Sequence, residues 1–191
     1  MSEPKQLPPL KLLPNGLVCP TEALIIAIHD EIISYRKTLG RYDTAAIRDP
    51  GLIKHLCEVL TDRMHKYKKD PRENAFYIAT ETFYYIACQH PFHDGNKSTA
   101  YITALIVLWT NLLLNSIKVE GMTKDGVIRT IPLDPRQFRF QYNMKELETA
   151  KVNAPKEAEE ITRLAEAGRD DAEVKRLIKE FLEKCIGANN G

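Results

Sequence analysis

The sequence has little that would mark a secreted, disulfide-linked or nucleic-acid-binding protein. It has only four cysteines in 191 residues, and they are far apart and form no Cys-x-x-Cys pair. Scattered cysteines are typical of free thiols in a reducing compartment, not of a disulfide framework or a zinc site. Its 27 basic and 26 acidic residues leave a net charge of +1, so no excess of positive charge favours nucleic acid or an anionic membrane. We therefore expect a cytoplasmic protein.

A long uninterrupted apolar run is also missing. Four prolines lie within the first 14 residues and break up any apolar segment there, which argues against a secretory signal. The most apolar stretch, residues 100–114, is shorter than the roughly 20 residues of a membrane span and contains Thr103, Thr110 and Asn111. Because it is apolar on every side, it predicts a helix buried at the centre of a domain, with no membrane partner.

Helical periodicity dominates the rest of the chain. With 43% hydrophobic residues, the chain can bury a core and is most simply one domain. We expect an extended, proline-rich arm over the surface at residues 1–19 and a helical domain at 20–150. Within that domain, apolar stripes predict helices after Pro20, after Pro50 and over residues 73–89. At 151–191 we expect two helices, 155–167 and 171–186, that pack on the same domain.

A smaller element is predicted after residue 114. Residues 116–122 and 127–133 flank the turn sequence Thr-Lys-Asp-Gly and resemble a β-hairpin, and Pro135 follows as a helix start. The predicted fold class is therefore mainly α: a helical bundle around a central buried helix, with a small β-hairpin.

The part of the chain with the most chemistry is residues 90–97, which read His-Pro-Phe-His-Asp-Gly-Asn-Lys directly before the apolar run. This is the layout of an anion site at a helix start. Unpaired backbone N–H groups and the positive end of the helix dipole attract phosphate oxygens there, and glycine permits a close approach of the backbone. The pattern favours phosphate chemistry.

Each side chain in this stretch has a functional and a structural interpretation. His90 can accept a proton near neutral pH, or can simply interact with the end of the preceding helix. Asp94 can hold Mg²⁺, which favours one or two carboxylates plus substrate oxygens, or can cap the helix together with Asn96. Lys97 offers a charge to a phosphate, or is a solvated lysine. Phe92 is interpreted as a core residue that fixes the loop.

Residues 90–100, His-Pro-Phe-His-Asp-Gly-Asn-Lys-Ser-Thr-Ala, resemble the signature of the Fic/Doc family, His-x-Phe-x-Asp/Glu-Gly/Ala-Asn-Gly/Lys-Arg. The lysine is more similar to the Doc (death-on-curing) branch than to the Fic branch, in which glycine is usual. Upstream, Ile-His-Asp at residues 28–30 and Ile-Arg-Asp-Pro-Gly-Leu-Ile at 47–53 are similar to stretches of Doc-like proteins. The resemblance covers about residues 20–115.

The resemblance implies a Fic/Doc-type helical bundle that transfers a phosphoryl or nucleotidyl (AMP) group from a nucleoside triphosphate to a protein hydroxyl. ATP or another nucleoside triphosphate and Mg²⁺ are the implied substrate and cofactor. His90 would be the catalytic base, and Asp94 the metal or proton-handling carboxylate. The implied phosphate cradle consists of Gly95, Asn96, Lys97 and Ser98.

The resemblance also implies partners. Doc-like proteins are toxins that a small antitoxin neutralises by covering the site with a helix, so such a helix is an expected partner. The basic stretch at residues 66–72 lies in the general region where the family carries a flap that positions the target peptide. Residues 116–121, Ser-Ile-Lys-Val-Glu-Gly, match the family's inhibitory-helix pattern. We interpret that match as chance, because the residues fall in a predicted strand.

One position departs from the family pattern. Ser98 stands where the signature has arginine, so the planar fork that grips a phosphate is missing there. Arg63, Arg72 and Arg129 are candidates to replace it. Two alternatives therefore stay open beside the active transferase: a catalytically degenerate Fic/Doc domain that binds nucleotide or protein, and a helical interaction module that binds no nucleotide.

Overall fold

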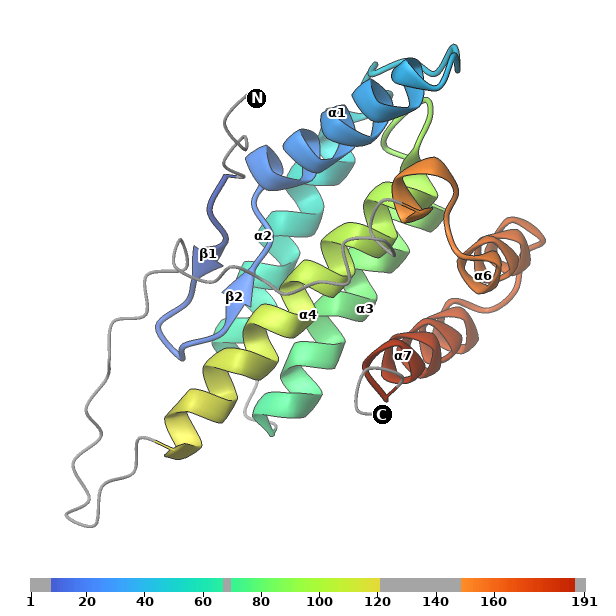
Figure 1. Ribbon diagram of the computed structural model, residues 1–191. Helices are drawn as coiled ribbons and strands as arrows, with labels where there is room; N and C mark the ends of the chain where they lie inside the picture. The colour runs from blue at the N-terminus through green and yellow to red at the C-terminus, as the bar shows by residue number, and fades with distance from the viewer. Residues whose placement is uncertain (1–7, 67–69, 121–148, 188–191) are drawn as a thin grey trace, which may run out of the picture.

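The protein is mainly helical, as predicted, with one small antiparallel sheet (Figure 1). The structure is a computed structural model, and it describes residues 8–66, 70–120 and 149–187. The elements in chain order are β1 (Lys11–Leu12), β2 (Val18–Cys19), α1 (Glu22–Thr38), α2 (Pro50–Lys66), α3 (Pro71–Cys88), α4 (Asn96–Glu120), α6 (Lys156–Glu166) and α7 (Asp171–Gly187).

Helix α4 is the central element. Residues 98–108 are all buried, α3 packs along the helix, and α1, β2 and α6 also contact it (Figure 1). Residues 96–114 are long and apolar enough to cross a membrane by length and composition, and 72% of that window is buried inside the protein. The hydroxyl of Thr110 donates a hydrogen bond to the carbonyl oxygen of Ile106. The predicted core helix is confirmed.

Helices α1, α2 and α3 begin within two residues of the predicted starts. The hydroxyl of Thr21 accepts the N–H of Leu24 at the start of α1, and α1 ends before Gly40, which adopts a φ of +79°. The carboxylates of Asp49 and Asp70 accept backbone N–H groups at the starts of α2 and α3 in the same way. These side chains satisfy donors that have no partner within a helix. The apolar stripes then place the three helices around α4.

The segment before α1 differs from the predicted surface arm. Strands β1 and β2 form an antiparallel hairpin, and Val18 and Cys19 are buried. The amide of Asn111 in α4 binds both backbone groups of Val18: Oδ1 accepts its N–H at 2.8 Å and Nδ2 donates to its carbonyl at 2.9 Å. Because an unpaired buried amide is costly, this two-point contact attaches the hairpin to the core.

Helix α4 extends to Glu120, whereas the sequence predicted a strand from residue 116. Adding a residue to a helix that already exists costs little, and no glycine or proline interrupts the chain before Gly121. The helical stretch therefore continues past the apolar run. The remainder of the predicted hairpin and the helix predicted from Pro135 lie outside the described residues.

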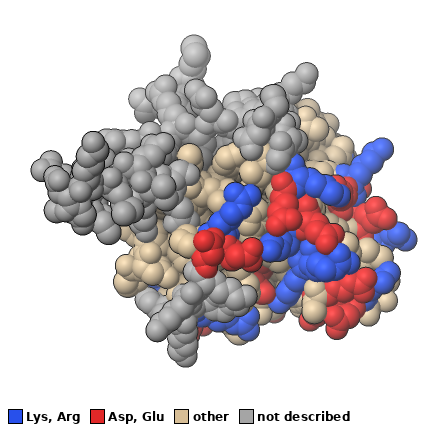
Figure 2. Space-filling view, turned by 90° about the horizontal axis from the view of Figure 1, so that it is seen from below, with Lys and Arg blue, Asp and Glu red and all other residues tan. Residues whose placement is uncertain are grey.

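Helix α6 contacts α3 and α4, and α7 packs along one side of α3. Gly168, with a φ of +80°, ends α6, because the N–H of Arg169 returns to the carbonyl of Leu164 as in a Schellman cap. The buried face of α7 packs on α3. Figure 2 shows acidic and basic side chains interspersed over the described part of one face. Ion pairs that join α7 to α3 and α6 are Lys175–Glu81, Lys179–Glu73 and Lys184–Glu157.

We predict that Asn111→Ala lowers the free energy of unfolding by about 3 kcal/mol, because it leaves a buried N–H and a buried C=O of Val18 without a partner. The control is Asn153→Ala, which removes an exposed amide that accepts one bond from Arg41. Urea unfolding of the two variants and the wild type measures the difference. Equal stabilities of the two variants would contradict the role assigned to Asn111.

Candidate functional site

The loop that joins α3 to α4 is fixed by its backbone. The carbonyl of Pro91 accepts the N–H groups of Arg48 (2.7 Å) and Asp49 (2.9 Å), and the N–H of His93 donates to Ala46. Phe92 is 1% exposed, which confirms that it is a core residue. The loop therefore lies beside the segment that precedes α2, and the two segments form one edge of the site.

Asn96 closes the same loop from the start of α4. Its Oδ1 accepts the N–H of Phe92 at 2.9 Å, and its Nδ2 donates to the carbonyl of Phe92 at 2.8 Å. Gly95 adopts a φ of +75°, and a Cβ there would meet Cδ1 of Ile33 at 3.2 Å. The side chain of Asn96 thus fixes the loop, and the lack of a side chain at Gly95 permits its conformation. These two residues can therefore offer a ligand only their backbone groups.

His29 of α1 supports the loop from below. Its ring is fully buried and stacks on Phe92 with 3.8 Å between the ring centroids. Nε2 lies 3.0 Å from the carbonyl oxygen of Asp94 and must carry the proton, since a carbonyl only accepts. Burial lowers the pKa of His29, although the Asp94 carbonyl and Asp30 oppose this. The imidazole is therefore neutral near pH 7 and holds the backbone at Asp94.

The start of α4 has open hydrogen-bond donors. The Asp94 carboxylate accepts the N–H of Thr44 at 2.9 Å, and the Asn96 side chain binds Phe92, so neither caps the helix as the structural interpretation proposed. Among the described residues, no group accepts the N–H of Asn96, Lys97 or Ser98. Unpaired N–H groups at the positive end of a helix attract anions.

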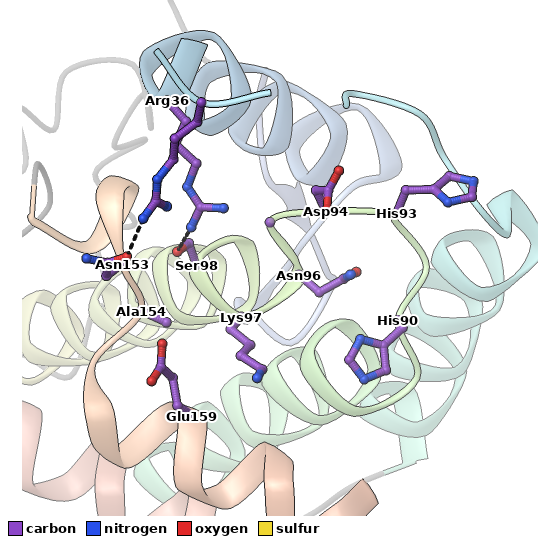
Figure 3. Close-up of a pocket in the computed structure, with 12 residues that line it drawn as sticks. Arg36, His90, His93, Asp94, Asn96, Lys97, Ser98, Asn153, Ala154 and Glu159 are labelled. Carbon is purple, nitrogen blue, oxygen red and sulfur yellow. Dashed lines mark hydrogen bonds between the residues drawn. The ribbon is translucent and has the colours of Figure 1, made fainter. Parts of the chain in front are cut away.

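These N–H groups lie at a pocket of about 300 Å³ (Figure 3). All of the residues predicted for the site line it, together with others that the sequence did not indicate. Among the described residues, Lys97 forms no ion pair, so its charge is available to a ligand. The lining residues are Arg36, Arg41, His90, His93, Asp94, Gly95, Asn96, Lys97, Ser98, Asn153, Ala154 and Glu159.

His90 lies two residues beyond the end of α3 and has a φ of +51°. This left-handed conformation is uncommon for a residue with a side chain and costs of order 1–3 kcal/mol. The imidazole Nε2 lies 3.1 Å from Oε1 of Glu166, the last residue of α6. His90 is therefore held by a partner on another helix and does not simply interact with the end of its own.

Ser98 is fully buried, and its hydroxyl accepts a hydrogen bond of 2.8 Å from Nη2 of Arg36. An arginine from α1 thus approaches the position at which the family signature has its own. Nε of Arg36 also donates to the carbonyl of Lys151 at 2.7 Å, and Nη1 pairs with Asp43 at 3.2 Å. The guanidinium is therefore committed to protein groups.

The three arginines proposed from the sequence do not take this place. Arg63 donates to the phenol of Tyr77, and Arg72 lies over the ring of Phe76. Arg129 lies outside the described residues. The arginine that the structure places at Ser98 is Arg36, and its guanidinium binds protein groups.

The segment after residue 148 forms one wall of the pocket. Arg41 donates to the carbonyl of Val152 at 2.8 Å and to Oδ1 of Asn153 at 2.9 Å, while Arg36 binds Lys151. Ala154 is buried behind them. The end of α1 thus holds residues 151–154 against the start of α4 (Figure 3).

Asp94 offers one carboxylate to a metal ion. Oδ2 is held by the N–H of Thr44, which fixes the direction of the group. Within the described ranges, no cluster of three or more His, Cys, Asp or Glu could hold a metal alone. This donor set fits Mg²⁺ that arrives with phosphate oxygens, because that ion is commonly held by one or two carboxylates plus substrate.

Two regional expectations change with the structure. Of the basic stretch at residues 66–72, residues 70–72 lie at the start of α3, whose 18 residues span about 27 Å, so they are at the opposite end of that helix from His90. The pattern at residues 116–121 begins in a helix, not a strand, and α4 has 25 residues, about 37 Å. Glu120 therefore lies at the opposite end of a continuous helix from the site. The inhibitory-helix pattern is rejected because of this distance, not because its residues form a strand.

Several lining residues were missed from the sequence. Arg36 had a signal: it falls four residues after Ile32, on the apolar stripe of α1, where a charged residue needs a buried partner. Glu159 and Glu166 are seven residues apart and so lie on one face of α6, but nothing in the sequence places that face beside His90. The same holds for Asn153.

The fold and the site define a helical domain whose central helix presents an anion-binding start beside a histidine and a carboxylate. Residues 19–108 match the model of the Fic/DOC family. The match includes α1, the motif loop and the first half of α4, which confirms the resemblance over these residues; α6 and α7 lie outside it. Comparison with curated proteins and with solved structures gave no match.

We predict that Arg36→Ala lowers the free energy of unfolding by on the order of 3 kcal/mol, because it removes one partner of a largely buried ion pair and two further contacts. Arg41→Ala is the matched control: this arginine also reaches residues 152 and 153 but is exposed, so its loss should cost less than about 1 kcal/mol. Chemical denaturation compares them, and equal losses would argue against the buried role.

Proposed function

We propose that the protein is a Fic/Doc-type transferase that moves a phosphoryl or nucleotidyl group from a nucleoside triphosphate to a hydroxyl of a protein. The observation that carries the proposal is that His90, Asp94 and Lys97 line the same pocket as the open N–H groups of α4. The match to the Fic/DOC family over residues 19–108 supports the same class.

The chemistry divides among these groups. The target hydroxyl oxygen attacks a phosphorus atom of the triphosphate, and the bond from that phosphorus to its bridging oxygen breaks. Attack at the γ-phosphorus releases a nucleoside diphosphate, and attack at the α-phosphorus releases pyrophosphate. His90 takes the hydroxyl proton, while Lys97 and the helix start stabilise the negative charge. Mg²⁺ held by Asp94 would neutralise further phosphate charge.

The remaining expectations stay proposals. A toxin role and a small antitoxin whose helix covers the site follow only from the resemblance to Doc-like proteins, and a cytoplasmic location follows only from the scattered cysteines. Phosphoryl and AMP transfer differ in the mass of the group added to the target. Incubation of the protein with ATP, Mg²⁺ and a cell lysate, followed by mass spectrometry, therefore distinguishes them.

A second function is favoured by a specific observation. The guanidinium of Arg36 donates to Ser98, Asp43 and Lys151, so neither the motif nor this arginine offers a free bidentate fork to a phosphate. A domain that binds nucleotide or protein without transfer is consistent with that arrangement. Nucleotide binding with no modified protein in the lysate experiment would favour it over the transferase.

Triphosphate binding should depend on Lys97 and on Mg²⁺. We expect Lys97→Ala to weaken binding of Mg-ATP about tenfold, since a charge-assisted contact contributes about 1.5–3 kcal/mol. Asp94→Asn retains an acceptor for the Thr44 N–H but reduces the gain from added Mg²⁺. Lys37→Ala, an exposed lysine of α1, is the control. Calorimetry measures all four proteins, and no binding by the wild type with Mg²⁺ present would refute the proposal.

Transfer, as distinct from binding, should depend on His90. We use His90→Asn because asparagine tolerates the left-handed backbone at this position but cannot act as the base. We expect transfer to fall about 10²–10⁴-fold while the affinity for nucleotide stays nearly unchanged. His55→Asn, a substitution on the exposed side of α2, is the control. Equal transfer by His90→Asn and wild type would exclude His90 as the base.

A further inference from the structure

Glu166 is the one carboxylate, among the described residues, that pairs with His90. Oε1 lies 3.1 Å from Nε2 of the imidazole, and the side chain of His90 is 29% exposed. An ionised carboxylate only accepts hydrogen bonds, so this contact is attractive only when Nε2 carries the hydrogen. In a neutral imidazole one nitrogen donates and the other accepts, which leaves Nδ1 as the acceptor.

The backbone of Glu166 is held firmly. It is the last residue of α6, and the cap that follows is closed by the N–H groups of Ala167, Gly168 and Arg169. On the other side of the helix, Ala158 and Thr162 are fully buried. The carboxylate therefore extends toward His90 from a fixed point, and α6 itself contacts α4 and α3 (Figure 1).

The local helix structure does not favour an acidic residue at position 166. The C-terminal end of a helix carries partial negative charge and favours cations, so a glutamate as the last residue of α6 is opposed by the helix dipole. A half-exposed ion pair also contributes little to stability. A residue placed against its local preference is more often functional than structural.

We infer that Glu166 is a positioning residue for His90, which holds the imidazole in the Nε2–H tautomer and so presents Nδ1 as the proton acceptor. The inference rests on the proposed transferase function. When the target hydroxyl attacks phosphorus, its proton passes to Nδ1, and the imidazolium that forms is stabilised by the Glu166 carboxylate. The proton then leaves Nδ1 for solvent, and the pair returns to its starting state.

The test compares Glu166→Ala and Glu166→Gln in the full-length protein, with Glu160→Ala as the matched control. Glu160 is an exposed acid on the same helix that does not line the pocket. Nitrogen-15 NMR of labelled histidines reports the tautomer of His90 directly, with His90→Asn to assign its signals. Thermal unfolding confirms that all variants remain folded.

We expect wild type, Glu166→Gln and Glu160→Ala to show the Nε2–H tautomer, because the glutamine oxygen still accepts a hydrogen bond. Glu166→Ala should show a mixture and lose about a hundredfold in transfer, the size of a misplaced reacting group. The glutamine variant should retain an intermediate rate, since it keeps the orientation and lacks the charge.

Two outcomes would overturn the inference: an unchanged tautomer in Glu166→Ala, or a changed tautomer with wild-type transfer. Absence of transfer in the wild type would count against the proposed function instead. The tautomer measurement needs no substrate. Even if the wild type shows no transfer, an unchanged tautomer in Glu166→Ala would therefore refute the role of Glu166 in positioning His90.

Discussion

The burial of residues 98–108 of α4 is the constraint on which the site depends. Burying a polar group of a helix in apolar surroundings is costly unless the group finds a partner inside the protein. Asn111 meets this need with both backbone groups of Val18, and Ser98 meets it with Arg36. The start of the helix reaches a pocket with open N–H groups, and this is where the histidine, carboxylate and lysine gather.

The same constraint explains which features the sequence could reveal. Helix positions followed from apolar periodicity and from the prolines near two of the helix starts, because these signals are local. The motif was readable because its residues are contiguous. Arg36, Asn153 and Glu166 were missed because their roles come from contacts with residues far along the chain. The end of α4 was misplaced because β-branched residues at 117 and 119 suggested a strand, although nothing there breaks a helix.

Three stretches of chain build the pocket, and they differ in their relation to known proteins. The end of α1 and the motif loop fall within the residues that match the Fic/DOC family, whereas residues 151–159 and Glu166 do not. The histidine, the aspartate and the lysine thus lie in the matched part, and the wall that contains Asn153, Ala154 and Glu159 lies outside it. Contacts from Arg36 and Arg41 join the two parts.

The left-handed backbone at His90 means that the residue best for stability differs from the residue needed for chemistry at this position. Glycine adopts this conformation without strain and asparagine nearly so, and either would relax the junction between α3 and α4. A library selected only for heat tolerance should therefore enrich those two residues at position 90. Selection for an unaltered cellular phenotype should enrich histidine instead, and the two selections together would separate what the fold prefers from what the imidazole does.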